Sequence, residues 1–143
     1  MAKIRVAQSG TAVAPLPGKI RKLSPTARHC ALWALLLVDS GMTAQQALAT
    51  AFSSASSVAC SAESSGLAPV ERNLCSELVY GYLRTELRIA FILSRVLPRP
   101  QSLPHPLLHV LGLAVYGLLF QDKVPDHAAV FSAVETAQAL FGH

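Results

Sequence analysis

Apolar residues recur at helical spacing along most of the chain, and no segment alternates apolar and polar residues as an exposed strand does. Residues 31–38 are apolar on nearly every face, which predicts a helix over 27–38 at the centre of a bundle. Ser24 is suited to cap this helix and Pro25 fits its first turn, while Gly41 suits its C-terminal stop. The pattern predicts an all-α fold.

Two further segments follow with clear boundaries. Thr43 can cap a short helix over 44–52, and the Ser- and Ala-rich stretch 53–66 indicates a flexible loop. Pro69 opens the next helix, which should run to about Leu83 with one face buried. That buried face is predicted to comprise Leu74, Leu78 and either Gly81 or Tyr82.

The second half of the chain predicts three more helical segments, over about 85–97, 109–120 and 128–141. In the first, we expect Arg84, Arg88 and Arg95 on the polar side. Its inward residues are predicted to be Leu87, Ile89, Phe91, Ile92, Leu93 and Val96. Prolines at 98 and 100 should end it. Gly112 and Gly117 in the apolar second segment predict that another helix crosses closely.

Length and composition indicate one compact domain. The chain has 143 residues, of which 52% are hydrophobic and only 14% charged, so a disordered chain is excluded. The longest uncharged apolar run, 110–120, is far shorter than the about 20 residues that a membrane-spanning helix needs. Cys30, Cys60 and Cys75 form no CxxC pair, so we expect neither a zinc site nor a disulfide framework. We expect Cys30 and Cys75 to be buried as small apolar residues, and the protein to be cytoplasmic.

Positive charge is concentrated at the start of the chain. No acidic residue occurs before Asp39, and half of the 12 lysines and arginines lie in that region. Residues 1–23 contain glycines and prolines and no helical period, which predicts an irregular basic arm. Such an arm favours polyanions, although a merely solvated terminus gives the same pattern.

The candidate chemistry is sparse. Phosphate-binding and dinucleotide-binding glycine motifs are absent. Asp126 and His127 are neighbours on a helix start, where a capping role for Asp126 is favoured over an acid–base pair. His105 and His109 have the i, i+4 spacing of metal ligands, but Pro106 between them and the lack of a carboxylate or cysteine partner argue against a metal. We therefore expect no catalytic and no metal site, and no enzyme activity in this chain.

RNA binding is the better-supported activity. Arg21, Lys22 and Arg28 flank the start of the first helix, where free N–H groups and the positive dipole end attract phosphate. Arg84 and Arg88, one turn apart, form a second candidate patch, unless Arg88 instead pairs with Glu86 or solvent. Few aromatic residues are predicted to be exposed, so phosphate and shape recognition are expected rather than base stacking.

Specific motifs point to a family. They are Glu77-Leu-Val-Tyr-Gly-Tyr-Leu-Arg84, Leu113-Ala-Val-Tyr-Gly-Leu-Leu119, Pro125-Asp-His-Ala-Ala-Val130 and Ser132-Ala-Val-Glu135. Over 24–143 the chain resembles the NusB-type helical RNA-binding domain. It is most similar to the version at the N-terminus of small-subunit rRNA cytosine-C5 methyltransferases, the Sun or RsmB family. The resemblance implies a NusB-like bundle of about six helices, with the basic arm over 1–23 and RNA contacts at Arg21, Lys22 and Arg28.

The resemblance also implies what lies outside the chain. The family domain normally closes with one more helix, and the methyltransferases continue into an S-adenosylmethionine-binding domain with a Pro-Cys motif. Neither is present here. We therefore expect an excised N-terminal domain with no cofactor of its own, partnered by an attached or associated methyltransferase domain. An apolar groove left open by the missing helix is expected to support self-association as a homodimer.

The resulting functional hypothesis is a non-catalytic domain that binds and positions small-subunit rRNA for a cytosine-C5 methyltransferase. Two alternatives stay open. One is a stand-alone transcription antitermination factor that binds RNA together with a ribosomal protein. The other is a helical protein-interaction module in which the basic arm is incidental. Fold analogy by itself does not decide among these functions.

Overall fold

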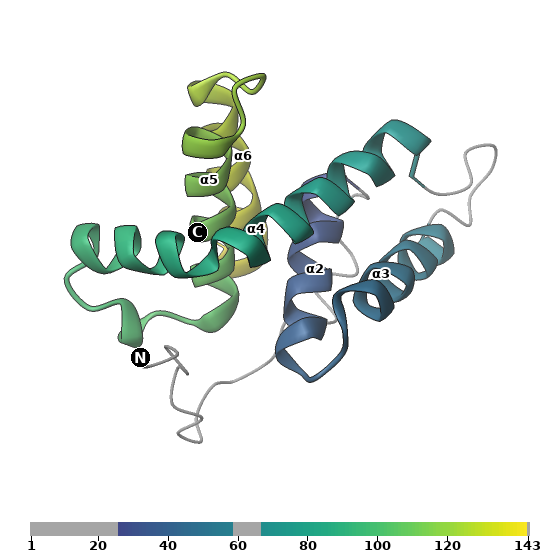
Figure 1. Ribbon diagram of the computed structural model, residues 1–143, viewed down its shortest axis with the longest axis horizontal. Coiled ribbons are helices and arrows are strands. Elements are labelled where there is room, and N and C mark those ends of the chain that lie inside the picture. The colour runs from purple at the N-terminus through teal and green to yellow at the C-terminus, as the bar shows by residue number, and fades with distance from the viewer. Residues whose placement is uncertain (1–25, 59–66, 143) are drawn as a thin grey trace.

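The computed structural model describes residues 26–58 and 67–142, and all of the regular structure there is helical (Figure 1). The α-helices are α2 (Ala27–Asp39), α3 (Ala44–Val58), α4 (Pro69–Val96), α5 (His105–Phe120) and α6 (Asp126–Phe141), with a 3-10 turn, η1 (Pro100–Ser102). The predicted all-α class is confirmed. The predicted basic arm lies outside the described residues.

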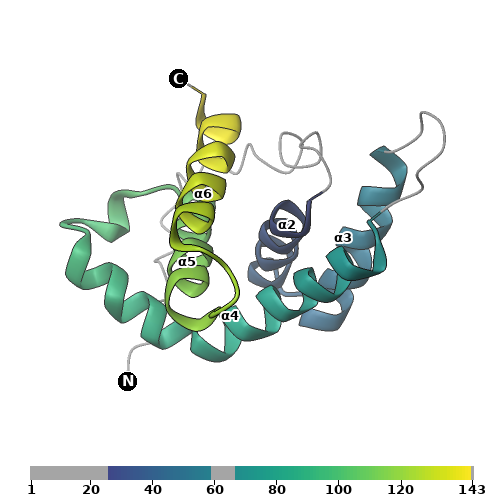
Figure 2. The same cartoon turned by 90° about the horizontal axis from the view of Figure 1, so that it is seen from above.

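The long helix α4 organises the molecule. It crosses the domain diagonally, with α2 and α3 against one half and α5 against the other, and α6 packs antiparallel against α5 (Figures 1 and 2). Helix α2 contacts α3, α4 and α5, which confirms its predicted central position. Its Ala31, Leu32 and Leu35 are almost fully buried, together with Leu78 of α4. Burial of such apolar side chains supplies most of the driving force for this packing.

Two segments predicted as separate helices, up to about Leu83 and from Thr85, are one 28-residue helix. No proline interrupts the sequence there, and the Thr85 hydroxyl donates to the Gly81 carbonyl at 2.8 Å within the helix. The prediction that Leu87, Phe91 and Val96 point inward is wrong, since their exposed fractions are 68%, 65% and 72%. This half of α4 packs mainly against α5, which covers only one of its faces.

Other helix ends differ from the prediction by a turn or more. Helix α3 continues to Val58, beyond the predicted end at Phe52, because its Ala- and Ser-rich sequence is compatible with a helix and Ser53 bonds back to Ala49. Thr26 caps α2, accepting a bond from the His29 N–H at 3.3 Å. Asp126 makes no capping bond and instead places its charge in the first turn of α6.

The close helix crossings predicted from glycine are confirmed. A Cβ on Gly112 would lie 2.6 Å from the Tyr82 ring on α4, and a Cβ on Gly117 would lie 3.2 Å from Ala129 Cβ on α6. A Cβ on Gly81 would likewise overlap the Tyr116 side chain of α5. Each glycine therefore marks a point where a neighbouring side chain occupies the space of its missing Cβ.

Cys30 and Cys75 are buried, as expected, and both are free thiols. Burial raises the pKa of the Cys30 thiol to about 11 and that of Cys75 to about 12, with the Glu71 charge adding to both. None of the described helices is both long enough and apolar enough to cross a membrane.

Candidate RNA interface

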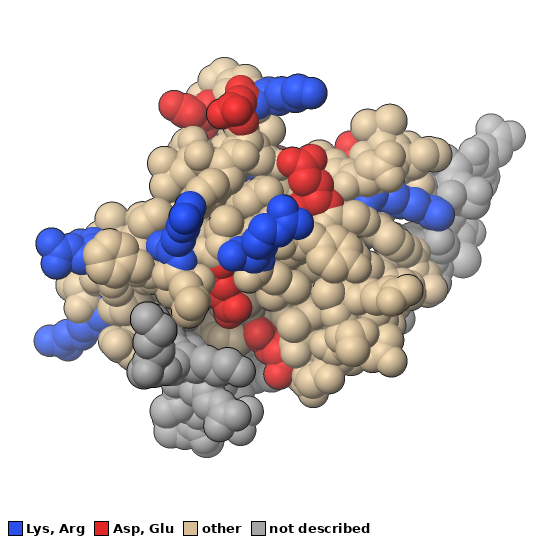
Figure 3. Space-filling model, in the orientation of Figure 1, with Lys and Arg blue, Asp and Glu red and all other residues tan. Residues whose placement is uncertain are grey.

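Arg84 and Arg88 lie one turn apart on the exposed side of α4, and Arg95 follows two turns later on the same side. Figure 3 shows the positive side chains spaced along this helix. None of these three arginines makes a salt bridge within the part of the chain that the structure describes. The alternative that Arg88 pairs with Glu86 is therefore not found there.

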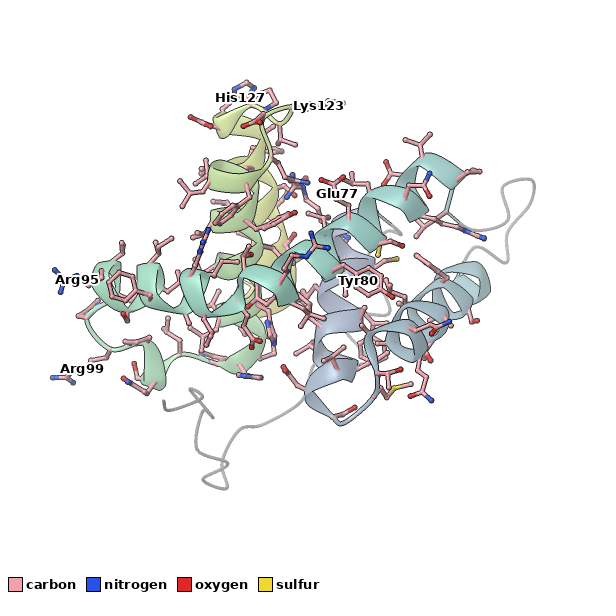
Figure 4. The ribbon with its side chains drawn as sticks, in the orientation of Figure 1. Glu77, Tyr80, Arg95, Arg99, Lys123 and His127 are labelled. Atoms are coloured by element: carbon pink, nitrogen blue, oxygen red, sulfur yellow. The ribbon has the colours of Figure 1, made fainter. Side chains whose placement is uncertain are left out.

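Two aromatic side chains interleave with these arginines. Tyr80 precedes Arg84 by four residues and is 43% exposed, and Phe91 lies between Arg88 and Arg95 and is 65% exposed. Tyr80 lies on the front of α4 and Arg95 at its end in Figure 4. We call this row, Tyr80, Arg84, Arg88, Phe91 and Arg95, the α4 stripe. Sequence reasoning missed its aromatic part because it predicted Phe91 to be buried.

Arg28 lies in a different environment from the α4 stripe. It is half-buried at the start of α2, and this burial lowers the pKa of its guanidinium. Its Nη1 atom lies 3.7 Å from the position that a Cβ would take on Gly117, so Arg28 packs against α5. Arg21 and Lys22 lie outside the described residues. The fold thus brings Arg84 and Arg88 together and places Arg28 on another helix.

The start of α2 is already supplied with acceptors. The Ala27 N–H donates to the Glu71 carboxylate at 2.9 Å, and the His29 N–H donates to the Thr26 hydroxyl. Two of the first N–H groups of this helix are therefore satisfied from within the chain. The expected attraction of phosphate by free N–H groups at this helix end is reduced accordingly.

A second polar cluster joins α2, α4 and α5. Asp39 Oδ2 lies 3.1 Å from His105 Nδ1 and 2.5 Å from His109 Nε2. The Tyr82 hydroxyl lies 3.0 Å from His109 Nδ1. We call these four residues the Asp39 cluster. The i, i+4 spacing of the two histidines in the sequence indicated that they lie close together. Asp39 is 70 residues from His109 in the sequence, and only the fold brings the two side chains together.

The Asp39 cluster is partly shielded from solvent. The side chains of Asp39 and His105 are 33% and 35% exposed, and that of His109 is 7% exposed. Burial raises the pKa of Asp39, but the hydrogen bonds and charges of the two histidines outweigh it and bring the pKa to about 2. The bond to Asp39 raises the pKa of His105. Asp39 is thus held as a carboxylate facing two imidazoles.

The other candidates are separate from both sites. Asp126 and His127 are exposed at the start of α6. In Figure 4, His127 and Lys123 lie together at the turn between α5 and α6. This turn is one end of the helix pair, and neither the α4 stripe nor the Asp39 cluster includes any of its residues.

Comparison with known proteins gives partial matches to one class of enzyme. Over 81 residues the chain is 33% identical to a probable ribosomal RNA small subunit methyltransferase B of Bacillus subtilis (strain 168). The aligned residues make up 57% of this chain and 18% of that protein. It is 35% identical over 74 residues to the protein of the same name from Synechocystis sp., covering 51% and 17%. A ribosomal RNA small subunit methyltransferase B of Erwinia tasmaniensis is 37% identical over 68 residues, covering 47% and 16%.

The chain therefore spans less than a fifth of the length of these relatives. The matches fall in the N-terminal part of those proteins. No solved structure matches the chain significantly. The model of the NusB family matches residues 25–143, which include every described helix. The chain belongs to the NusB family.

Proposed function

We propose that this chain is a non-catalytic RNA-binding domain that positions small-subunit rRNA for a cytosine-C5 methyltransferase. Membership of the NusB family and the partial similarity to ribosomal RNA small subunit methyltransferases B support the proposal. The observation that carries it is the α4 stripe, in which exposed arginines without salt-bridge partners among the described residues lie beside exposed aromatic rings.

Each part of the stripe suits a different part of an RNA strand. Guanidinium groups neutralise phosphates and release counterions, which gives affinity without sequence preference. Exposed Tyr and Phe rings offer faces on which unpaired bases stack. A single-stranded segment of rRNA running along α4 would meet both kinds of group in turn. Arg21, Lys22 and Arg28 would supply further phosphate contacts.

Catalysis belongs elsewhere in this proposal. S-adenosylmethionine, which this class of methyltransferase uses, would be bound by an attached or associated catalytic domain. The contribution of the present chain is to hold the RNA in a fixed orientation. Because positioning lowers the entropic cost of bringing RNA and catalytic domain together, a domain without reactive groups still contributes to the reaction.

The first test is binding of fluorescent small-subunit rRNA fragments, followed by anisotropy over a range of salt concentrations. Neutralising about three phosphates gives a log–log slope of affinity against salt of about −2 to −3. Replacing Arg84 and Arg88 together by Ala should weaken binding and make the slope shallower by about 1.5. Lys123→Ala removes a positive charge at the α5–α6 turn and is the control, with little change expected.

Stacking is separated from charge by a second pair of variants. Phe91→Ala should weaken binding by about 1–3 kcal/mol without changing the salt slope, because no charge is lost. Leu87→Ala removes an exposed apolar side chain of the same helix that cannot stack, and it should have little effect. Equal losses in both variants would argue against base stacking.

The basic arm and the start of α2 are tested together by replacing Arg21, Lys22 and Arg28 by Ala. We expect a lower affinity and a shallower salt slope. If these variants and the α4 variants all bind RNA like the unmodified chain, the assigned contacts are wrong. If the unmodified chain shows no salt-dependent RNA binding at all, the protein-interaction module becomes the better hypothesis.

A further inference from the structure

The Asp39 cluster places three metal-ligating atoms around one point. Asp39 Oδ2, His105 Nδ1 and His109 Nε2 all lie within 4.8 Å of one another, on the C-terminal end of α2 and the first two turns of α5. The sequence argued against a metal at His105 and His109 because no carboxylate lay nearby. Helix α2 supplies that carboxylate in the fold.

We propose that Asp39, His105 and His109 bind one divalent transition-metal ion of the Zn²⁺ class. Two imidazole nitrogens and one carboxylate oxygen are a ligand set that proteins use for such ions. Asp39 and His105 are each about one third exposed, so the fourth position of a tetrahedral site faces solvent and takes water.

Two of the three ligand-atom separations are close to those that the ion requires, and the third, between His105 Nδ1 and His109 Nε2, lies within 4.8 Å and would have to adjust on binding. Bonds of about 2.0–2.2 Å in a tetrahedral site separate ligand atoms by roughly 3.3 Å. Asp39 Oδ2 and His105 Nδ1 are already 3.1 Å apart. The 2.5 Å contact between Asp39 and His109 must widen by less than about 1 Å. Asp39 is the final residue of α2 and is partly exposed, so a small side-chain rotation provides this movement.

Tyr82 is placed as an orienting partner for one ligand. Its hydroxyl lies 3.0 Å from His109 Nδ1, on the opposite side of the ring from Asp39. Metal-binding histidines usually have the second ring nitrogen held in this way, which fixes the ring and leaves the other nitrogen free for the ion. Tyr82 and His109 are both buried, so this arrangement is held by the surrounding core.

The local field also favours a cation. Asp39 is the final residue of α2 and so lies at the negative end of the helix dipole. The Glu86 carboxylate acts on His105 in the same direction as Asp39. An ion bound here would connect the C-terminal end of α2 with the start of α5. Its effect would be to hold these two helices together, independently of RNA binding along α4.

The test uses the full chain without a histidine tag, stripped with chelator and titrated with Zn²⁺ in a calorimeter. We expect one ion per chain and a rise in melting temperature that grows with Zn²⁺ concentration. Co²⁺ in place of Zn²⁺ should give the intense visible absorption of a four-coordinate site. A titration without one-to-one binding would overturn the proposal.

Matched variants assign the ligands. Asp39→Asn and His105→Asn should each reduce Zn²⁺ affinity at least tenfold, whereas His127→Asn, at an exposed histidine of α6, should leave it unchanged. Circular dichroism of the metal-free variants checks that they fold, and His105→Asn is the safer variant because His105 is partly exposed. If the variants lose stability but the unmodified chain binds no Zn²⁺, the cluster is only a hydrogen-bond network. If His127→Asn alone loses binding, the ion lies elsewhere.

Discussion

Gly112 and Gly117 show how single positions on α5 set the distance to two different helices. A Cβ on Gly112 would meet the Tyr82 ring at 2.6 Å, and Tyr82 is held by His109, so its ring has little freedom to move away. A Cβ on Gly117 would meet Ala129 Cβ at 3.2 Å, and its other neighbours, Gln121 Oε1 and Arg28 Nη1, lie at the ordinary contact distances of 3.6 Å and 3.7 Å. The two glycines therefore differ in what a methyl group would displace.

We predict different outcomes for alanine at these positions. Gly112→Ala should lower the free energy of unfolding by about 1–3 kcal/mol, since overpacking against Tyr82 exceeds the helix-propensity gain of about 1 kcal/mol. Gly117→Ala should be close to neutral, because the same gain offsets a contact that needs only a small adjustment. Urea denaturation of the two variants checks this. A Gly112→Ala protein as stable as the original would show that α4 and α5 separate easily.

The polar residues of the Asp39 cluster show the limit of sequence reasoning at the same scale. The i, i+4 spacing of His105 and His109 is visible in the sequence, because helical neighbours are fixed by the helix repeat. The approach of Asp39 depends on how α2 packs against α5, which local spacing does not encode. Local pattern thus identified two ligands of the candidate site, and the third required the tertiary structure.

At the scale of elements, the sequence predicted which segments are helical but did not predict how long each helix is. Prolines at 69, 98 and 125 and the cap at Thr43 mark real boundaries, since proline and capping residues act locally. The continuity of α4 through Thr85 was missed, because no local signal distinguishes a short connection from a helix that simply continues. That continuity is what aligns Tyr80, Arg84 and Phe91 in one stripe.

Exposure along α4 was mispredicted for a related reason. Apolar periodicity assigned Leu87 and Phe91 to the core, although this half of the helix has a neighbour on one side only. Which faces of a helix are covered is decided by the number of helices packed around it. Apolar residues on a face that no neighbouring helix covers stay exposed, where they are available to ligands.

The N-terminus of α3 offers a test at this scale. The Gln46 N–H donates to the Thr43 hydroxyl at 3.2 Å, while the Thr43 N–H donates to Gln46 Oε1 at 3.3 Å, which is a reciprocal capping box. Thr43→Ala should lower the free energy of unfolding by about 1 kcal/mol. Thr50→Ala, which removes a hydroxyl bonded to the carbonyl of Gln46 within the same helix, should cost less. Equal losses in thermal melts of the two variants would mean that capping contributes nothing specific.

For the whole molecule, the all-α class and the central position of α2 could be predicted from apolar periodicity. The candidate RNA interface could be predicted only in part, since Arg84 and Arg88 were identified but the aromatic members were not. The sequence also led to the expectation of an uncovered apolar surface. Exposed apolar side chains lie on both sides of the α5–α6 turn, namely Leu118 and Leu119 on α5 and Val130, Phe131 and Val134 on α6.

This surface predicts self-association. Val130 and Val134 lie one turn apart on α6, with Phe131 beside them at 65% exposure, so a second copy could bury all three at once. We expect sedimentation velocity to show a concentration-dependent dimer, and Phe131→Ser to shift it toward monomer. Val70→Ser is the control, because Val70 is even more exposed, at 75%, but lies at the start of α4. A monomer at all concentrations that binds no hydrophobic dye would contradict the prediction, because an apolar surface left uncovered in water should register in one assay or the other.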